Sequence, residues 1–282
     1  MPNHLILPSP QLKIILAFGL LVLIAFAAAC ADAYNPESRL VDVGGHRLNI
    51  RCAGEGAPVV VLDAGLANDN HAWESVERRV SEFTRVCSYD RAGLGQSDAA
   101  AGAATSQTAS DDLHSLLSAA GIAGPVVLVG HSYGGLIAQI YAAQHPEDVV
   151  GVILVDSLHP DNLLKAGEIL GEAPMAALML GVQRNPEGVD LAASFDQVRA
   201  AGNLGDMPLT VITAGHSELP PFIERDLIER LTASWLESQR DLVRLSSAGT
   251  HVIAEDSGHC IQCSQPGLVA DVILLMVQAV RG

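Results

Sequence analysis

The chain has 282 residues, a length that a single α/β domain can reach, and 49% of them are hydrophobic while 17% are charged. This composition excludes a disordered chain. The 32 acidic residues outnumber the 16 basic ones, and the resulting net charge of −16 repels the phosphate backbone of nucleic acids. We therefore expect one main globular domain and no nucleic acid among its partners.

The N-terminal segment has a different composition from the rest of the chain. Lys13 precedes an uncharged apolar stretch, residues 14–29, which ends in three alanines directly before Cys30. Such a stretch is short for a membrane-spanning helix and typical of an export signal. We predict that residues 1–31 are a signal peptide or a membrane or lipid anchor, and that residues 34–282 form the folded domain. We expect the domain to be exported, as a periplasmic, secreted or membrane-anchored protein, with attachment to the membrane through this segment in the last case.

Short β-branched apolar runs alternate with helical patterns from Arg39 onward. This alternation predicts a mostly parallel sheet with helices on both faces. The first two runs flank Gly44-Gly45, a two-residue hairpin turn, so the sheet is expected to begin with an antiparallel pair. The eight expected strands are Arg39–Val43, His46–Cys52, Val59–Leu62, Arg85–Tyr89, Val126–Val129, Val150–Val155, Leu209–Thr213 and His251–Ala254.

Three further segments show helical spacing of their apolar residues. The pattern predicts helices over Asp111–Ala120, with Ser110 as the N-cap, over Leu136–His145, and over Pro266–Val280. Residues 158–207 have helical pieces, around 163–170, 175–180 and 191–200, but no strong strand signal. We interpret residues 158–207 as a small helical cap inserted after the sixth strand.

The most specific motif of the chain lies between an expected strand and an expected helix, and reads Gly130-His131-Ser132-Tyr133-Gly134. A serine at a sharp strand-to-helix turn keeps its Oγ exposed, and small residues two positions before and after it let the strand and helix approach closely. The motif therefore predicts Ser132 as a nucleophile. The alternative interpretation is a glycine-rich helix start with a capping serine. His131 is expected to pack nearby and not to act as the base.

A serine nucleophile needs a general base, and His259 is the candidate. It follows the last expected strand and precedes the last helix, which is the place of the base in the chain order of enzymes with this turn. The alternative is a surface-loop histidine. The sequence contains no P-loop and no His-Glu-x-x-His zinc motif, so we expect neither a cofactor nor a metal in the reaction.

The oxyanion of a tetrahedral intermediate requires two backbone N–H donors. We predict the amides of Tyr133, directly after the nucleophile, and of Leu66, in the loop after the third strand. After the fourth strand, Asp90 and Arg91 are interpreted as a structural pair of charges that fixes a loop near the site.

These motifs together resemble the α/β-hydrolase superfamily, over roughly residues 39–281. The resemblance is carried by residues 60–66, 88–95 and 130–135 and by Gly258-His259 ahead of Gln265-Pro266. It implies the α/β-hydrolase fold, with an eight-stranded, mostly parallel sheet flanked by helices and a small helical cap after the sixth strand. It also implies a cofactor-free Ser-His-acid triad that transfers acyl groups to water.

The acid of the triad remains open because the aspartate that the family usually carries after its seventh strand is missing. Asp156 closes the sixth strand, where some relatives place their acid. Glu218 lies three residues past Gly215, after the seventh strand. We favour Asp156, because a strand end is rigid and a short side chain suits it, and keep Glu218 as the alternative.

The family fold also bears on the cysteines. Its second and fourth strands are neighbours, which implies a disulfide between Cys52 and Cys87. Cys260 and Cys263 follow closely after His259, with two residues between them. This spacing resembles that of a redox pair or of half a metal site. Because no second cluster completes such a metal site, we interpret them as small buried thiols.

The resulting functional hypothesis is an esterase. We expect a serine hydrolase that resembles carboxylesterases and cleaves a small-molecule carboxylic ester through an acyl-enzyme. One alternative is a hydrolase of another acyl bond, such as a thioester, lactone, amide or carbon–carbon bond, on the same triad. An alternative of another class is a non-catalytic ligand-binding member of the fold.

Overall fold

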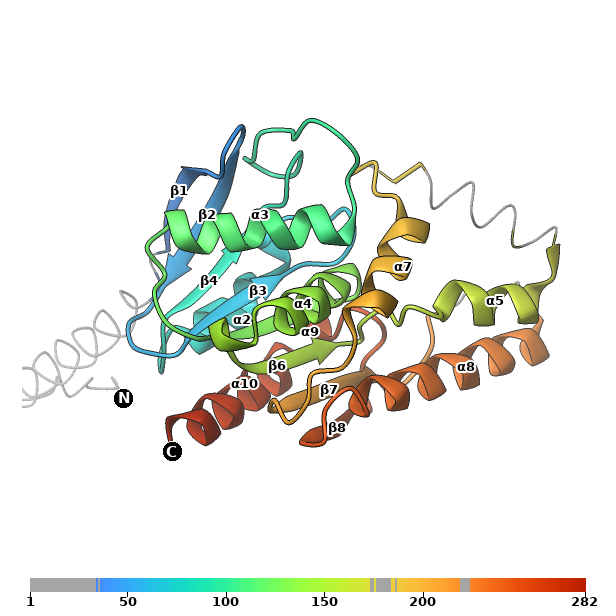
Figure 1. Cartoon of the computed structure of the whole chain (residues 1–282). Helices are drawn as coiled ribbons and strands as arrows, with labels where there is room; N and C mark the ends of the chain where they lie inside the picture. Colours follow the sequence, from blue (N-terminus) through green and yellow to red (C-terminus); the bar gives the residue numbers. More distant parts are fainter. Residues whose placement is uncertain (1–33, 35, 173–174, 176–183, 186, 219–223) are drawn as a thin grey trace, which may run out of the picture. The chain divides into compact units, whose positions relative to one another are not determined.

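An eight-stranded sheet runs through the protein (Figure 1). A computed structural model describes residues 34, 36–172, 175, 184–185, 187–218 and 224–282. Strand β2 is antiparallel to both of its neighbours, and all later pairs are parallel, which confirms the predicted fold class. In spatial order the strands are β1 (Glu37–Asp42), β2 (Arg47–Ala53), β4 (Val86–Tyr89), β3 (Val59–Asp63), β5 (Val126–His131), β6 (Val149–Val155), β7 (Leu209–Ala214) and β8 (Gly249–Ala254).

The burial of each strand depends on its place in the sheet. Every residue of β5 is buried, and β6 is buried at all but one position, as expected for central strands covered on both faces. Edge strand β8 has exposed positions along its length. At the predicted hairpin between β1 and β2, Gly44 and Gly45 have φ values of 101° and 137°, a conformation that side chains other than that of glycine rarely allow.

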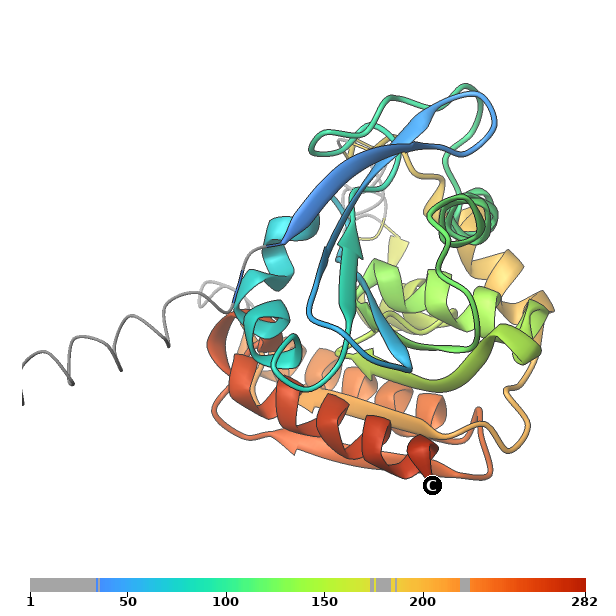
Figure 2. The same ribbon diagram turned by 90° about the vertical axis from the view of Figure 1, so that its left-hand side faces the viewer.

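Helices lie on both sides of the sheet (Figures 1 and 2). Helices α3, α4 and α7 contact one another on one side, and α2 and α10 contact each other on the opposite side. Helix α8 packs against β7, β8 and α5. The helices are α2 (Glu74–Val80), α3 (Ser106–Ala119), α4 (Tyr133–Gln144), α5 (Asn162–Leu170), α7 (Leu191–Ala201), α8 (Arg225–Val243), α9 (Ile261–Ser264) and α10 (Pro266–Arg281), with short 3-10 turns η1 (Asn70–Trp73) and η2 (Pro146–Asp148).

Helix α3 starts earlier in the chain than was predicted. Ser110 is not the N-cap, because the helix begins one turn earlier, at Ser106. Thr105 has an extended backbone, and it exchanges hydrogen bonds with Thr108: the Thr105 amide donates to the Thr108 hydroxyl at 2.9 Å, and the Thr108 amide donates to the Thr105 hydroxyl at 3.2 Å. This reciprocal capping satisfies two amides of the first turn, so Thr105 is the stronger cap.

Two predicted segments lie partly or wholly outside the described residues. The signal or anchor segment, residues 1–31, is wholly outside them, and so is most of the predicted helical piece 175–180. Helices α5 and α7 belong to the predicted cap and lie between β6 and β7 in the chain. No helix within the described ranges is long and apolar enough to cross a membrane.

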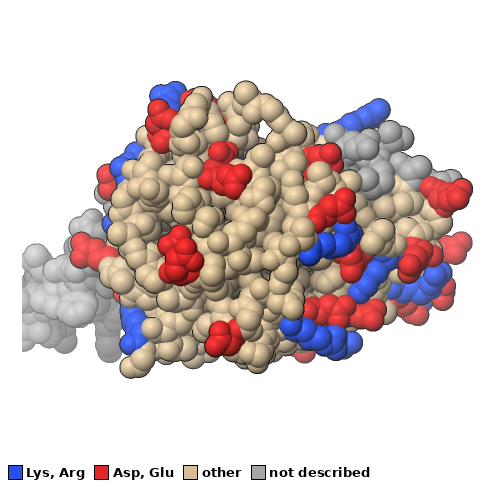
Figure 3. Space-filling view, in the orientation of Figure 1, with Lys and Arg blue, Asp and Glu red and all other residues tan. Residues whose placement is uncertain are grey.

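Charged side chains gather over α5 and α8, at the right of Figure 3, whereas the surface over α3 and α4 is largely uncharged. The Lys165 ammonium of α5 lies 3.2 Å from the Asp241 carboxylate of α8 and 3.9 Å from that of Glu237. These ion pairs connect the first cap helix to α8.

Two disulfides lie within the described residues. Cys52 and Cys87 are directly opposite each other on β2 and β4, with Cα atoms 4.1 Å apart, which confirms the predicted bridge. Cys260 and Cys263 also form a disulfide, so their interpretation as free thiols is wrong. The reason is local: residues three apart on one helical turn face the same side, and α9 brings their Cα atoms to 5.3 Å.

Candidate active site

Ser132 lies at the turn between β5 and α4 in a strained conformation. Its φ and ψ are 51° and −115°, one of the few positive φ values of a residue other than glycine in the described chain. Such strain persists only where the surrounding structure enforces it, and it is frequent at functional sites. The Ser132 residue is 9% exposed.

The flanking glycines show why the motif needs small residues. A Cβ atom on Gly130 would lie 2.5 Å from the carbonyl oxygen of Gly134, and one on Gly134 would lie 2.5 Å from the carbonyl oxygen of Asp63. The first approach brings strand and helix together. The second brings the start of α4 against the end of β3, so the loop that follows β3 lies beside Ser132.

His259 and Asp156 are in direct contact. The Nδ1 atom of His259 lies 2.7 Å from Oδ2 of Asp156, and the Asp156 carboxylate is almost completely buried. Asp156 follows β6 directly and has a φ of 41°. A carboxylate at this distance fixes the tautomer of the imidazole with its proton on Nδ1 and leaves Nε2 as the basic nitrogen.

The other carboxylate oxygen of Asp156 accepts two hydrogen bonds. Trp235 Nε1 and the Ala214 amide each donate to Oδ1 at 3.0 Å. The indole of Trp235 also meets the His259 ring edge to face, with centroids 5.9 Å apart. Helix α8 and the last residue of β7 thus both hold this carboxylate in place.

Glu218, the alternative acid, lies elsewhere relative to the imidazole. Its carboxylate accepts a hydrogen bond from the backbone amide of His259 at 3.3 Å, and the residue is exposed. A Cβ atom on Gly258 would lie 2.1 Å from the Glu218 carboxyl carbon, so the glycine makes room for it. Glu218 therefore contacts the backbone of the loop that carries His259, whereas Asp156 contacts its ring.

The two amides predicted as oxyanion donors lie at neighbouring chain segments. Tyr133 is the first residue of α4, where backbone N–H groups have no acceptor within the helix. Leu66 follows β3, whose residue Asp63 is paired with Gly130 of β5. Within the described part of the chain, neither amide donates to a protein acceptor.

A buried arginine holds both donor segments. Arg91 Nη1 donates to Asp63 Oδ1 and to the carbonyl of Ala64, each at 2.6 Å, and Nη2 donates to the carbonyl of Gly65 at 2.7 Å. Its guanidinium also lies 5.2 Å from the ring centroid of Tyr133. Arg91 thereby connects the loop that precedes Leu66 to the helix that begins at Tyr133.

The charge of Arg91 is balanced on two sides. Its Nη2 also donates to Glu187 at 2.7 Å, and its Nε donates to the other oxygen of the same carboxylate at 2.9 Å. Burial acts to lower the pKa of the guanidinium, but the carboxylates of Asp63 and Glu187 outweigh it and raise the pKa, so Arg91 stays charged.

The predicted pairing of Asp90 with Arg91 is wrong, although both residues fix loops. Asp90 accepts hydrogen bonds from Asn49 Nδ2 at 3.0 Å and from the amides of Asn70 at 2.8 Å and Gln96 at 3.0 Å. Consecutive side chains at a strand end point in different directions, so the two charges find separate partners.

His131 packs against the base candidate, as predicted for a residue that is not itself the base. Its Nε2 donates to the carbonyl oxygen of His259 at 3.0 Å, and the two ring centroids are 4.7 Å apart. Burial lowers the pKa of His131 to about 4, an effect that the neighbouring His259 strengthens. His131 is therefore neutral at physiological pH.

Two residues of the site were not predicted from the sequence. Trp235 lies on α8, a helix that was not predicted, and its bond to Asp156 spans 79 positions of the chain. Glu187 contacts Arg91 across 96 positions. Neither residue belongs to a motif, so no local signal in a single sequence could have identified them.

The comparisons with known proteins agree with this architecture. Residues 58–185 match the family model described as alpha/beta hydrolase fold. The chain has the α/β-hydrolase fold, and its matched residues are similar to that superfamily. With an esterase of Thermogutta terrifontis it shares the fold, with a TM-score of 0.63 and 21% identity over 87% of this chain and 100% of the esterase. The matches support a hydrolase as the broad class of the protein.

Two relatives by sequence were also found. The uncharacterized protein YqjL of Bacillus subtilis is 25% identical over 77% of this chain and 82% of its own length. A protein of Hormonema carpetanum named as a probable transporter, efuK, is 28% identical over 88% of this chain. The chain spans only 44% of the length of that second relative.

Proposed function

We propose that the protein is a serine hydrolase that cleaves carboxylic esters through an acyl-enzyme on Ser132. One observation carries the proposal: strained Ser132 is tied through its neighbour His131 to the loop of His259, whose ring contacts the buried carboxylate of Asp156. A nucleophile, a base and an acid that orients the base are the parts that acyl transfer requires.

In the proposed acylation, Nε2 of His259 takes the proton of the Ser132 hydroxyl while Oγ forms a bond to the carbonyl carbon of the ester. The carbonyl oxygen becomes an oxyanion, which accepts hydrogen bonds from the amides of Leu66 and Tyr133. The imidazolium then gives its proton to the departing alkoxide, and the alcohol leaves. Asp156 stabilises the imidazolium throughout.

Deacylation repeats these steps with water. His259 takes a proton from the water molecule, whose oxygen attacks the acyl carbon, and the imidazolium returns the proton to Ser132 Oγ as the carbon–oxygen bond breaks. The products are a carboxylic acid and the regenerated serine. No step needs a cofactor.

A fluorophosphonate probe tests the nucleophile. We expect covalent labelling of the wild-type protein at Ser132, no labelling of Ser132→Ala, and unchanged labelling of the control Ser115→Ala, which alters a serine on α3. The ester hydrolysis rate of Ser132→Ala should fall below about 1% of wild type, as it does when a triad member is removed. A wild-type protein that resists the probe would favour a non-catalytic ligand-binding member of the fold.

The substrate class needs its own experiment. A panel of p-nitrophenyl esters of graded chain length, extended by one thioester, one lactone and one anilide, compares the acyl bonds that the same triad can attack. We expect kcat/KM to be highest among the esters of short to medium acyl chains. A higher kcat/KM for the thioester or lactone would assign the protein to that bond type.

We also propose that the domain is exported. The two disulfides support this, because disulfides persist in oxidising compartments outside the cytosol. Cell fractionation, with mass spectrometry of the N-terminus of the mature protein, tests the proposal. A new N-terminus close to Cys30 is expected, and lipid on that cysteine would show attachment to a membrane.

A further inference from the structure

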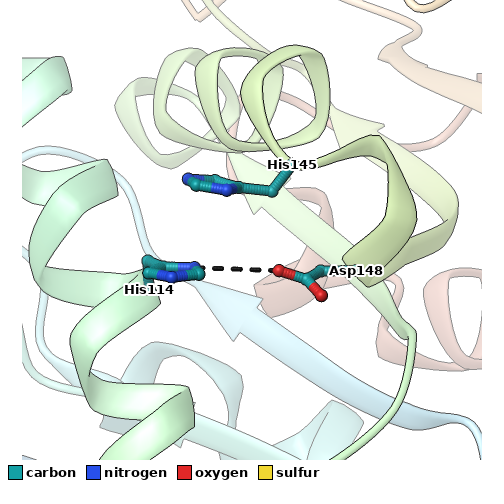
Figure 4. A group of neighbouring side chains, drawn as sticks. All are labelled: His114, His145 and Asp148. Atoms are coloured by element: carbon teal, nitrogen blue, oxygen red, sulfur yellow. Dashed lines mark ion pairs between the residues drawn. The ribbon is translucent and has the colours of Figure 1, made fainter.

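Three side chains that could bind a metal ion meet at the surface, at the end of α4 that is remote from Ser132 (Figure 4). They are His114 of α3, His145 at the C-cap of α4 and Asp148 of η2. Each offers one ligand atom, and the three atoms lie within 4.8 Å of one another. In the described ranges of the chain no other such group of three was found.

The cluster is separate from the candidate active site. Helix α4 begins directly after Ser132 and ends directly before His145, and its 12 residues extend over about 18 Å. The proposed reaction uses none of the three side chains. Their arrangement therefore needs an explanation of its own.

Packing and ion pairing explain the cluster only in part. The imidazole rings of His114 and His145 are stacked, with centroids 4.2 Å apart and an angle of 10° between the planes. His114 Nδ1 lies 3.8 Å from the Asp148 carboxylate, beyond hydrogen-bond distance, and both side chains are more than 40% exposed. An exposed ion pair of this kind contributes little stability. The Tyr141 hydroxyl lies 3.4 Å from His114 Nδ1, and the Tyr141 ring lies 5.0 Å from that of His145, so Tyr141 packs beside the pair without supplying a charge.

We propose that His114, His145 and Asp148 form a binding site for a divalent transition-metal ion of the zinc class. Two imidazoles and one carboxylate are ligands that Zn²⁺ prefers, and a water molecule can complete the tetrahedron. Mg²⁺ and Ca²⁺ prefer oxygen ligands throughout, so they should bind much more weakly. The net charge of −16 favours cation binding further.

Binding requires a small rearrangement. Zinc takes nitrogen and oxygen ligands at about 2.0 to 2.2 Å, so the ligand atoms must approach one another to roughly 3.3 Å. Rotation of the His145 and Asp148 side chains can achieve this, because both are at the surface. The stack of the two rings opens in the process. The bound ion then joins α3 to α4 and to the turn before β6.

The experiment uses the full, tag-free protein after treatment with a chelator. Isothermal titration with ZnCl₂ measures affinity and stoichiometry for the wild type, His145→Ala and Asp148→Asn. The matched control is His71→Ala, because His71 and Asp69 form a similar exposed pair, 3.2 Å apart, without a third ligand. Thermal unfolding without metal verifies that each variant is folded.

We expect one zinc ion per wild-type chain at this site, with affinity at least tenfold lower in both cluster variants and unchanged in His71→Ala. Zinc at a concentration 100 times its Kd should raise the Tm of the wild type by about 5 to 10 °C, because it binds only the folded state. The rise should disappear in the cluster variants and should not occur with MgCl₂. Zinc affinity that is equal in wild type, His145→Ala and Asp148→Asn, or the absence of stoichiometric binding to the wild type, would overturn the proposal.

Discussion

His131 connects the turn of the nucleophile candidate to the loop of the base candidate. Its Nε2 donates to the carbonyl oxygen of His259 at 3.0 Å, and the two rings lie 4.7 Å apart. Because His131 directly precedes Ser132, this single hydrogen bond fixes the distance between two loops that are 128 positions apart in the chain. The second ring nitrogen, Nδ1, is buried and has no partner among the described residues.

The first prediction tests this connection. In His131→Gln the side-chain amide can replace Nε2–H as the donor, whereas His131→Leu removes the donor and leaves a carbonyl unpaired. A hydrogen bond of this kind contributes about 1 kcal/mol, so we expect the leucine variant to lose roughly three- to tenfold in kcat on one ester while KM changes little. The glutamine variant should keep most of the rate. Equal losses in the two variants would show that the hydrogen bond does not position the base.

The second prediction concerns acid stability. The pKa of His131 is about 4 in the folded protein, against 6.5 for the ordinary group. At pH above 6.5 both states are neutral at this residue. As the pH falls from 6.5 to 4, the unfolded chain binds a proton that the folded protein does not, so the free energy of unfolding decreases.

The folded and unfolded pKa values of His131 differ by about 2.5. This difference lowers the free energy of unfolding by up to about 3 kcal/mol between pH 6.5 and pH 4. Urea unfolding of the wild type and His131→Gln at pH 7 and pH 4.5 measures it. The variant should lose less free energy of unfolding than the wild type between the two pH values. A wild type and variant with the same pH dependence would show that His131 already binds a proton in the folded protein.

The third prediction distinguishes the two acid candidates. In Asp156→Asn the ring of His259 loses its carboxylate partner, and an amide can hold the imidazole in the wrong tautomer. A loss of up to about 10⁴-fold in kcat is expected, as in serine proteases. Glu218→Gln keeps an acceptor for the His259 amide and should cost less than about tenfold. A large loss for the glutamine variant alone would reverse the assignment.

The comparison of these two acids shows how far a sequence can predict the site. Ser132 and Asp156 each directly follow a buried strand, and His259 lies in the loop between the edge strand β8 and the last helices. Strand ends can be recognised from local apolar runs. Trp235 completes the surroundings of Asp156 but lies on α8, which has a clear polar face and lies outside every motif. Contacts between remote chain positions depend on tertiary packing, and one sequence carries no signal for them.

The strands of the sheet could be predicted more reliably than the start of α3 or the Cys260–Cys263 bridge, because their signal is local in the sequence. Hydrophobic runs of β5 and β6 are nearly continuous, so burial on both faces could be predicted. The start of α3 depended instead on competition between Thr105 and Ser110 as caps, and only their hydrogen bonds decide it. The Cys260–Cys263 bridge likewise depended on a short helical turn that no apolar pattern indicates.

The fourth prediction separates the two disulfides. Cys52–Cys87 closes a loop with a sequence separation of 35, and Cys260–Cys263 closes one with a separation of 3. Loop-closure entropy then gives about 4 kcal/mol of stability for the long loop and about 2 kcal/mol for the short one. The short loop, however, directly follows His259.

We therefore expect the double variant Cys52→Ser with Cys87→Ser to unfold at clearly lower urea concentration than the wild type. The double variant Cys260→Ser with Cys263→Ser should lose less stability but more kcat, because the loop of the base candidate is less constrained. Urea unfolding and ester kinetics on both variants measure this. The reverse pattern, with activity lost only in the first variant, would contradict the prediction.

The last prediction concerns Arg91, whose guanidinium holds the carbonyls of Ala64 and Gly65 next to the amide of Leu66. In Arg91→Lys the charge remains, but a single ammonium cannot reach all four acceptor groups in the same geometry. Displacement of one oxyanion donor costs up to about 10²- to 10³-fold in kcat, so a partial displacement should cost roughly 10- to 100-fold. Arg91→Met should also lower the free energy of unfolding, by about 3 to 5 kcal/mol, because the buried carboxylates of Asp63 and Glu187 lose their partner.

The control for Arg91 is Arg47→Lys, which alters an arginine whose pair with Asp98 is exposed, and it should change neither kcat nor unfolding. Steady-state kinetics on one ester and urea unfolding of the three variants give the comparison. Because an oxyanion donor acts mainly in the transition state, kcat should fall in Arg91→Lys while KM stays near its wild-type value. A raised KM with unchanged kcat would mean instead that Arg91 shapes the binding of the substrate, through the contact of its guanidinium with Glu187 of the cap.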